Sequence, residues 1–334
     1  MSYESLVKKV FADLEHVDSS KFANYDNKAA TLLNVTSDRN IVNSLNTMVE
    51  GVHFLSNVKA CDLAYKALVS NYSKLMALGA EPICFQINIS MPKISELWLE
   101  DFASGLREST EKYGGYLTGV SLVTGKSSIA VSSIGQVAYD IGSVKNAAPQ
   151  VSDLIYVTGS LGDAGLALNR ILQDIPNDDN TSRYLEKCLM KPEIPLKFAV
   201  ELQTITTSCT EISAGLSQDL KRILTKTALG AHINLKDIPL SEQIKAVIER
   251  NAAYQCAFTG ADDYEICFTV KPENKDKLLE LAGRYDCRLS CIGHLSAHPG
   301  MHVYDKYDEP FVIKDSDHDH FAIIDYKGDE EGAS

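Results

Sequence analysis

The sequence predicts an α+β protein built from two domains. Apolar residues recur at helical spacing in long segments such as 60–79, whereas ICFQINISM (83–91) is a short apolar run of the kind found in buried strands. The stretch DIGSVKNAAPQVSD (140–153) lacks periodicity and separates two halves of this kind. We therefore place the domains at residues 1–146 and 147–325, and we expect the acidic tail at 326–334 to be disordered.

In the first half, the expected strands follow one another closely. The second long helix starts at Ser95 and stops at Gly114-Gly115. The expected elements are an amphipathic helix within 1–17, strands at 29–35 and 39–49, a helix at 60–79, a strand at 83–91, a helix from 95 to 114, and strands at 116–123 and 127–139. Strands so close in sequence indicate a mainly antiparallel or mixed sheet covered by two helices.

The second half opens with LIYVTGSLGDAGLAL, a strand, a glycine-containing turn and a helix. The turn TGSLGDAG could cradle a phosphate, but it has no lysine for the phosphate charge, which favours a plain turn capped by Asp163. Helices are then expected to about residue 229. Strands at 231–235 and 264–270 flank a helix near 241–251, and the helix ENKDKLLELAGRYD and the strand CRLSCIGHL follow.

Composition excludes several classes of protein. The chain is 45% apolar and 23% charged, as in an ordinary globular protein, and its net charge of −13 argues against nonspecific nucleic-acid binding. No apolar run is long enough to cross a membrane. The eight cysteines form no CxxC pair, so we expect reduced thiols and a cytoplasmic location.

Three groups of polar residues could belong to a site. Asp262 and Asp263 precede a strand and could bind a hard cation, or they could form a solvated turn. Glu50 and His53 flank a glycine after another strand, where His53 could act as an acid-base group, contact substrate or simply pack. His318 lies in an alternating Asp/His tail, which is a weak signal for metal binding.

Eight segments, taken in order, resemble motifs of the thiamine-monophosphate kinase family. The first three, DNKAATLL, NSLNTMVEGVHF and SNYSKLMALGAEP, resemble GDDAAVL, TTDMLVEGVHF and NLSDLAAMGAEP. The next two, LTGVSLV and LIYVTGSLGDAGLAL, resemble VGGDTT and YVTGxLGDAxxGL. The last three, EISAGLSQDL, GADDYEICFTV and DHDHF, resemble DISDGLxxDL, GEDYELLFTV and GWDHF.

This resemblance implies a fold and a reaction. The implied fold is the two-domain α+β architecture shared with aminoimidazole ribonucleotide synthetase, whose N-terminal sheet is covered by helices and pairs across a homodimer. The implied reaction transfers the γ-phosphoryl group of ATP to thiamine monophosphate. It needs Mg²⁺ held mainly by aspartates, because two polyanions can approach only when cations neutralise them.

The sequence departs from the family at positions that the resemblance assigns to metal ligands. Asp26, Glu211 and Asp219 keep a carboxylate and are the remaining metal candidates, with Ser213 between two of these positions. Elsewhere the family residues are replaced, and His318 stands where the family has a tryptophan that stacks on substrate. The replacing residues are Asn27, Ser44, Asn46, Lys74, Ser121 and Ala214.

These substitutions leave three hypotheses. The chain is a homologue whose catalysis is weak or lost and which keeps a binding or interaction role, or it is a working but divergent ATP-dependent kinase. In the third hypothesis it binds nucleotide or thiamine phosphate without Mg²⁺, and Lys74 replaces a metal's charge. In the family-like fold we expect Lys74 to lie near Asp26 or near bound phosphate.

Overall fold

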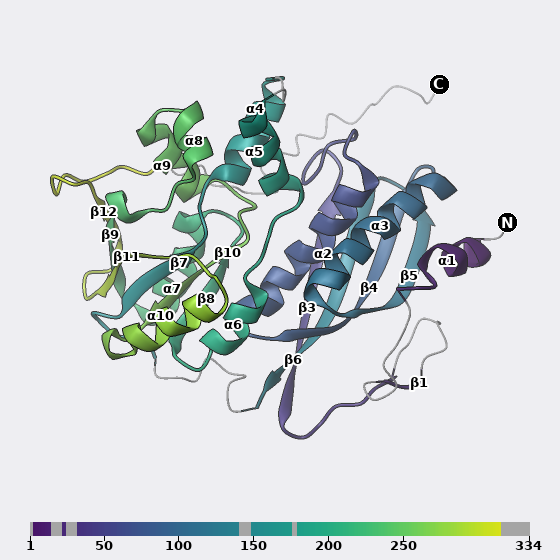
Figure 1. Cartoon of the computed structure of the whole chain (residues 1–334), viewed down its shortest axis with the longest axis horizontal. Helices are drawn as coiled ribbons and strands as arrows, with labels where there is room; N and C mark the ends of the chain where they lie inside the picture. Colours follow the sequence, from purple (N-terminus) through teal and green to yellow (C-terminus); the bar gives the residue numbers. More distant parts are fainter. Residues whose placement is uncertain (1–2, 15–21, 25–31, 140–147, 176–178, 315–334) are drawn as a thin grey trace, which may run out of the picture.

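The computed structural model places two halves of α+β structure side by side (Figure 1). It describes the chain except for residues 1–2, 15–21, 25–31, 140–147, 176–178 and 315–334. The acidic tail expected at 326–334 therefore lies outside the described residues. The same is true of three predicted site residues, Asp26, Asn27 and His318. The two-domain α+β fold predicted from the sequence is confirmed by the elements described next.

The N-terminal half is built on a four-stranded mixed sheet in the order β3-β6-β4-β5. Strands β3 (Arg39–Val49), β6 (Ser128–Ala138) and β4 (Glu81–Met91) pair antiparallel, and β5 (Tyr116–Thr124) pairs parallel to β4. The connection between these parallel strands is helix α3 (Glu96–Tyr113), as a parallel pair requires a crossover. A short helix and a two-stranded ribbon precede the sheet: α1 (Tyr3–Phe11), β1 (Phe22–Asn24) and β2 (Leu32–Leu33).

Helices α2 (Ala60–Ala77) and α3 cover one face of this sheet (Figure 1). The predicted start of α3 is confirmed, because the Ser95 side chain accepts a hydrogen bond of 3.2 Å from the backbone N–H of Trp98. Helix α2 ends before Gly79, whose φ of +65° favours glycine. The other face carries exposed Ile41, Leu45 and Val123.

The C-terminal half contains a six-stranded sheet in the order β12-β9-β11-β7-β10-β8. Adjacent strands in this sheet pair antiparallel, except for β12 and β9, which pair parallel. The strands are β7 (Leu154–Thr158), β8 (Thr206–Ile212), β9 (Gly230–Asn234), β10 (Glu265–Val270), β11 (Leu289–Ser296) and β12 (Gly300–Tyr304). The helices are α4 (Asp163–Leu172), α5 (Asn180–Met190), α6 (Leu196–Leu202), α7 (Leu216–Thr227), α8 (Glu242–Val247), α9 (Arg250–Thr259) and α10 (Lys275–Arg284), with 3₁₀ turns at Leu235–Asp237 and Pro272–Asn274.

Several local predictions differ from the structure. The expected helix near 241–251 is two helices, α8 and α9, separated by extended residues Ile248 and Glu249. The strand expected at 29–35 is described only at Leu32–Leu33. The sequence does not predict strands β8 and β12, since TTSCTEI contains few apolar residues and GMHVY is a run of only five residues.

The largest apolar core is shared by both halves. It contains Leu68 and Leu75 of α2 together with Phe198 of α6 and Phe268 of β10. Ring stacking continues into the second half, where Tyr156 and Phe268 have centroids 5.8 Å apart. Helix α2 is therefore buried between the N-terminal sheet and the C-terminal half.

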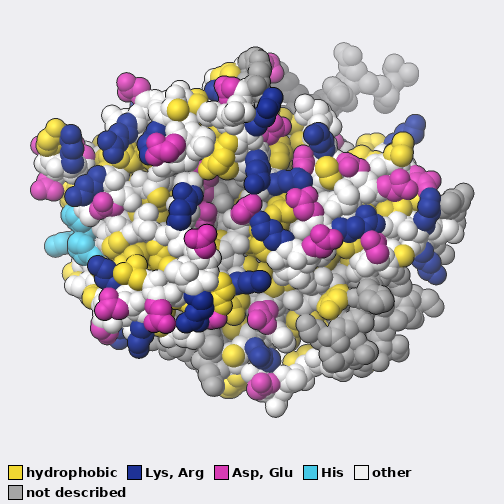
Figure 2. Space-filling view, viewed as in Figure 1, with side chains coloured by type: hydrophobic (Ala, Val, Ile, Leu, Met, Phe, Trp, Pro, Cys, Tyr) yellow, Lys and Arg dark blue, Asp and Glu magenta, His cyan; other side chains and the backbone are white. Residues whose placement is uncertain are grey.

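Acidic and basic side chains are interspersed on the face shown in Figure 2. Among the described residues, no helix is both long and apolar enough to span a membrane.

Candidate functional site

Helix α2 carries a polar stripe on an otherwise apolar surface. Lys66, Ser70, Ser73 and Lys74 recur at three- to four-residue spacing and therefore share a face. Lys66, Ser70 and Ser73 are 4%, 1% and 0% exposed. Buried polar groups need partners, and these four find theirs on β3 and on the second half of the chain.

On the β3 side, the stripe meets two predicted site residues. The ammonium of Lys74 donates to the backbone oxygen of Leu45 and to Oδ1 of Asn46, each at 3.0 Å. The amide of Asn46 donates to Ser70 Oγ at 3.0 Å. Ser44 Oγ donates to Oδ1 of Asn71 at 2.6 Å. The structure thus brings Ser44, Asn46 and Lys74 to the same face of α2.

On the other side, the stripe meets β8 and the start of α7. Ser73 Oγ donates to one oxygen of Glu211 at 2.6 Å, and Ser213 Oγ donates to the other at 3.2 Å. Asp219 accepts from the backbone N–H groups of Ser213 and Ala214 at 2.7 and 2.8 Å. Its second oxygen lies 2.9 Å from Arg222 Nη1. Both oxygens of Glu211 therefore accept hydrogen bonds, whereas among the described residues Asp219 Oδ1 has the Arg222 cation beside it but no hydrogen-bond donor.

The third contact joins the two halves through a buried ion pair. Lys66 Nζ lies 2.8 Å from Asp262 Oδ2, and the two side chains are 5% and 25% exposed. Tyr264 donates its hydroxyl to the other oxygen of Asp262 at 2.7 Å. Burial opposes ionisation of Asp262, but the charge of Lys66 and these hydrogen bonds prevail, so its pKa is lowered.

Asp263 has a different role from its neighbour. Its carboxylate accepts from the backbone N–H of Gly162 at 2.8 Å and lies 3.5 Å from that of Ala164, at the start of α4. Asp163, which the sequence predicted as the cap, instead accepts from Ser241 Oγ at 2.5 Å and from Ser160 Oγ at 2.9 Å. The capping prediction was wrong because the N-terminus of α4 is reached by a carboxylate about one hundred residues away, which local sequence cannot reveal.

The remaining predicted residues are less closely joined. Nδ1 of His53 accepts from the backbone N–H of Val49 at 3.1 Å, and the charge of His53 contributes to the lowered pKa of Asp262. Glu50 is exposed and pairs with Phe54 in an isolated bridge. Ser121 lies on β5, paired with exposed Asn88, so it faces away from the α2 side of the sheet. The structure does not bring Ser121 to the other predicted residues.

Burial shapes the charges of this cluster. It lowers the pKa of Lys74, an effect that nearby Glu211 opposes and Arg222 reinforces. It raises the pKa of Asp219, which its backbone donors and Arg222 partly offset. Three cations, Lys66, Lys74 and Arg222, thus lie among three carboxylates of the protein itself, Asp262, Glu211 and Asp219.

The donor set can be compared with the Mg²⁺ that the resemblance implies. Magnesium prefers carboxylate and water oxygens in octahedral geometry. Positions 44, 46, 74 and 214 supply a hydroxyl, an amide, an ammonium and a methyl group. The ammonium of Lys74 donates a hydrogen bond to the amide oxygen of Asn46. Such a set does not fit a group of magnesium ions. Within the described residues, no three His, Cys, Asp or Glu side chains are grouped so that they could hold a metal ion.

Comparison with known proteins identifies the family. The AIR synthase related protein models match residues 26–142 for the N-terminal domain and 150–306 for the C-terminal domain. The thiamine-monophosphate kinase of Haemophilus influenzae is 32% identical over 295 residues, covering 88% of this chain and 89% of that protein. The chain belongs to the thiamine-monophosphate kinase family.

Solved structures agree with this assignment. The crystal structure of thiamine-monophosphate kinase from Stenotrophomonas maltophilia K279a superposes with a TM-score of 0.83 at 29% identity, covering 91% of this chain and 96% of that one. A structure described as AaThiL complexed with AMPPCP and TMP has the same fold, with a TM-score of 0.72 at 21% identity, covering 91% and 95% of the two chains.

Sequence reasoning missed Lys66, Ser70 and Arg222. The signal for the first two was present in α2, because polar residues recur at 66, 70, 73 and 74 in a helix that is otherwise rich in apolar residues. The apolar stripe through Tyr72, Leu75 and Met76 predicts the helix, but it does not draw attention to these polar residues. Arg222 gave no such signal, since exposed basic residues on a helix are common.

Proposed function

We propose that this chain is a thiamine-monophosphate kinase homologue in which phosphoryl transfer is weak or lost and which keeps a binding or interaction role. The observation that carries the proposal is the ammonium of Lys74 at 3.0 Å from Asn46 Oδ1. By resemblance, both positions belong to carboxylates that hold magnesium. A fixed ammonium there opposes a divalent cation by several kcal/mol at close range, at an effective dielectric of roughly 20.

The balance of charge supports the same proposal. The carboxylates that remain are compensated by the protein's own cations, as the Lys66–Asp262 and Arg222–Asp219 pairs illustrate. ATP and thiamine monophosphate would together bring several negative charges, and kinases neutralise such charge with metal ions. In this site the polar side chains bind one another, so they do not offer that metal-binding capacity.

A working but divergent kinase is the alternative. It is favoured by the proximity of Glu211 and Asp219, and by similarity to a curated kinase over 88% of the chain. In either case nucleotide and thiamine phosphate are the ligands to test, since a structure with this fold is described with AMPPCP and TMP. The third hypothesis, binding of phosphate by Lys74 without Mg²⁺, predicts nucleotide affinity that does not depend on magnesium.

The decisive test is formation of thiamine diphosphate from ATP and thiamine monophosphate with Mg²⁺, using the H. influenzae kinase as positive control. We expect turnover far below the ~1 per second or more of typical kinases. Lys74→Asp alone will not restore it, because Asn27, Asn46, Ser121 and Ala214 still lack carboxylates. Turnover within tenfold of the control would contradict the proposal and establish the alternative.

Calorimetric titration with ATP, with and without Mg²⁺, separates the remaining roles. Binding only with Mg²⁺ favours a divergent kinase, binding independent of Mg²⁺ favours Lys74 as the phosphate contact, and no binding favours an interaction role. The domains at 1–146 and 147–325, the homodimer and the cytoplasmic location stay predictions.

A further inference from the structure

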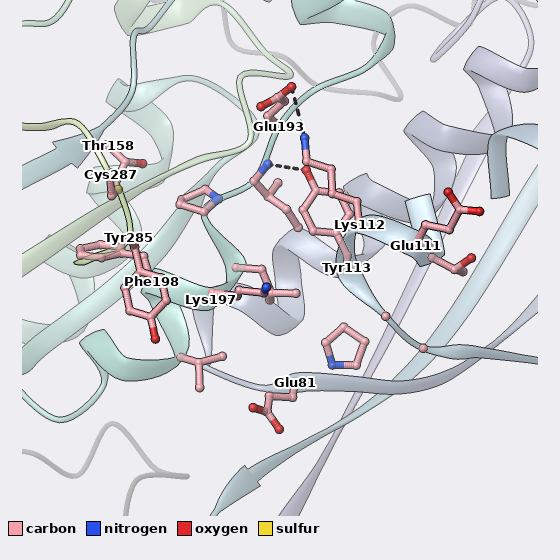
Figure 3. A pocket seen from close by; sticks show the side chains of 18 of the residues that line it. Glu81, Glu111, Lys112, Tyr113, Thr158, Glu193, Lys197, Phe198, Tyr285 and Cys287 are labelled. Carbon is pink, nitrogen blue, oxygen red and sulfur yellow. Dashed lines mark hydrogen bonds and ion pairs between the residues drawn. The ribbon is translucent and has the colours of Figure 1, made fainter. Parts of the chain in front are cut away.

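An open groove of about 1400 Å³ lies between the two halves of the molecule (Figure 3). The N-terminal half contributes the end of α3 and the start of β4. The C-terminal half contributes α6, the end of β7, the start of β10 and the turn after α10. None of the predicted site residues that the structure describes lines this groove, so its properties are argued separately from the kinase chemistry.

The lining of the groove is acidic. It contains seven carboxylate side chains and three cationic ones, a formal excess of four negative charges. Some are paired, as Glu193 is with Lys112 at 3.2 Å and Glu201 with Arg284 at 2.7 Å. An anionic ligand would be repelled by this surface, whereas a cation would be attracted.

Glu265, at the start of β10, supplies one of the carboxylates that line the groove. One of its oxygens accepts a hydrogen bond from Thr158 Oγ1. Burial raises the pKa of Glu265 to about 7, although Thr158 and Arg288 oppose the rise and Glu193 adds to it. The Cys287 thiol also lines the groove, and burial and the charge of nearby Glu265 raise its pKa.

The backbone is shaped to admit this carboxylate. Gly159 has a φ of +59°, and a Cβ at this position would lie 1.8 Å from Glu265 Oε1. The first glycine of TGSLGDAG therefore makes room for Glu265, which gives this turn a role other than phosphate binding.

Aromatic side chains form the walls on either side. Tyr285 and Phe198 lie on one wall and Tyr113 on the other (Figure 3). Tyr113 is held in place because its hydroxyl accepts from the backbone N–H of Ile194 at 3.1 Å. Aromatic faces attract organic cations and also pack against their apolar parts.

We propose that this groove binds a small organic ammonium ion, with the ammonium paired to Glu265 and the apolar body between Tyr113 and Tyr285. The carboxylate gives charge selectivity, and the aromatic walls supply apolar contact. Such a ligand would touch both halves of the chain at once and would stabilise their relative position.

Benzylamine is a suitable probe, because it combines one ammonium with one ring. Benzyl alcohol and benzoate serve as the matched neutral and anionic compounds. In calorimetric or NMR titrations of the full chain up to about 10 mM, we expect saturable binding of benzylamine alone. Equal binding of benzyl alcohol, or no saturable binding of benzylamine, would overturn the proposal.

Two variants locate the site. Glu265→Gln keeps the shape and the bond to Thr158 but removes the charge, and we expect benzylamine affinity to fall at least tenfold. Glu280→Gln is the control, since Glu280 is 78% exposed on α10 and does not line the groove. It should leave the affinity within twofold. Unchanged binding in Glu265→Gln would overturn the proposal.

Proton release tests the same contact in the unmodified protein. A cation that pairs with Glu265 favours its ionised form, so affinity should rise about tenfold from pH 6 to pH 8 for a group that titrates near 7. Titrations near pH 7 in buffers of different ionisation enthalpy should show proton release on binding. Binding without proton release and without this pH dependence would show that Glu265 is not the partner.

Discussion

Lys66 carries a buried positive charge into the contact between the two halves of the chain. Its partner Asp262 lies on the segment before β10, in a conformation with φ of +73°. Removing one member of a buried pair leaves the other charge without compensation, and this costs more than the pair itself contributes. The Lys66–Asp262 pair therefore fixes the 262–264 segment against α2.

We expect Lys66→Met to lower the free energy of unfolding by about 3 kcal/mol, measured by urea denaturation. Adding Asp262→Asn should recover part of this loss, because the uncompensated carboxylate is then gone. Lys245→Met is the control, since its pair with Glu242 is exposed and should change stability by less than about 1 kcal/mol.

The pH dependence of this pair has a definite sign. The pKa of Asp262 is lowered in the folded protein, so its contribution is fully present above the unfolded value near 3.8 and is lost as pH falls through the folded value. The deficit of Lys66→Met relative to the unmodified protein should therefore shrink below pH 4. A deficit that stays constant down to pH 2 would show that the loss comes from packing alone.

At the scale of single residues, the resemblance placed Asn46 and Lys74 among the site positions, but the sequence predicted neither the contact between them nor the Lys66–Asp262 pair. The grouping of site positions depended on family motifs, which carry spatial information across distant segments. Lys66 and Asp262 are 196 positions apart and belong to different halves, so periodicity within one helix could show only that Lys66 shares a face with Lys74. Whether Lys74 also meets Asp26 lies outside the described residues.

Strand β10 begins with a carboxylate that resists ionisation. Glu265 has a folded pKa of about 7 against 4.5 in an unfolded chain. Between these values the folded state holds the proton and the unfolded state does not. This contribution therefore favours the folded state at pH 4.5 and below, and it is lost as pH rises to 7.

We compare the free energy of unfolding of Glu265→Gln with that of the unmodified protein. The difference should shift in favour of the variant by roughly 2 kcal/mol as pH rises from 5 to 8, because glutamine avoids the cost of burying a charge. Chemical denaturation of both proteins at the two pH values measures the difference. Glu280→Gln should show no such trend. A difference that is equal at both pH values would mean that Glu265 ionises normally in the fold.

At the scale of elements, helix and strand identities in the first half followed from the sequence. Strand β3 has the predicted bounds, and α2 and α3 end at or near their predicted glycines. The pairing of strands could not be predicted from the sequence, because nothing local to GMHVY indicates that β12 pairs parallel to β9. The sheet order of the second half depends on contacts between segments far apart in the chain.

The whole molecule exposes one face of its N-terminal sheet. Ile41, Leu45 and Val123 project from it with exposures of 41%, 65% and 46%. We expect these faces to meet in a homodimer, measured as a twofold mass by light scattering at micromolar concentration. Apolar side chains on a broad sheet face are what such an interface requires.

Leu45→Arg should shift the protein to a monomer, because it places a charge on the face that the expected homodimer would bury. Leu97→Arg is the matched control: Leu97 is 78% exposed on α3, on the opposite side of the sheet, and should leave the mass unchanged. A monomeric unmodified protein, or a dimer that persists in Leu45→Arg, would exclude this interface.

The position of α2 also has a consequence for how the gene for such a protein can be divided. The helix belongs to the N-terminal half by sequence, yet its apolar side chains pack in one core with Phe198 and Phe268 of the C-terminal half. Either half made alone would present a large uncovered apolar surface and would tend to aggregate. The two halves should therefore melt in a single calorimetric transition, and proteolytic cuts between them should leave the fragments associated. Recombining one half with a foreign partner would disrupt this shared core.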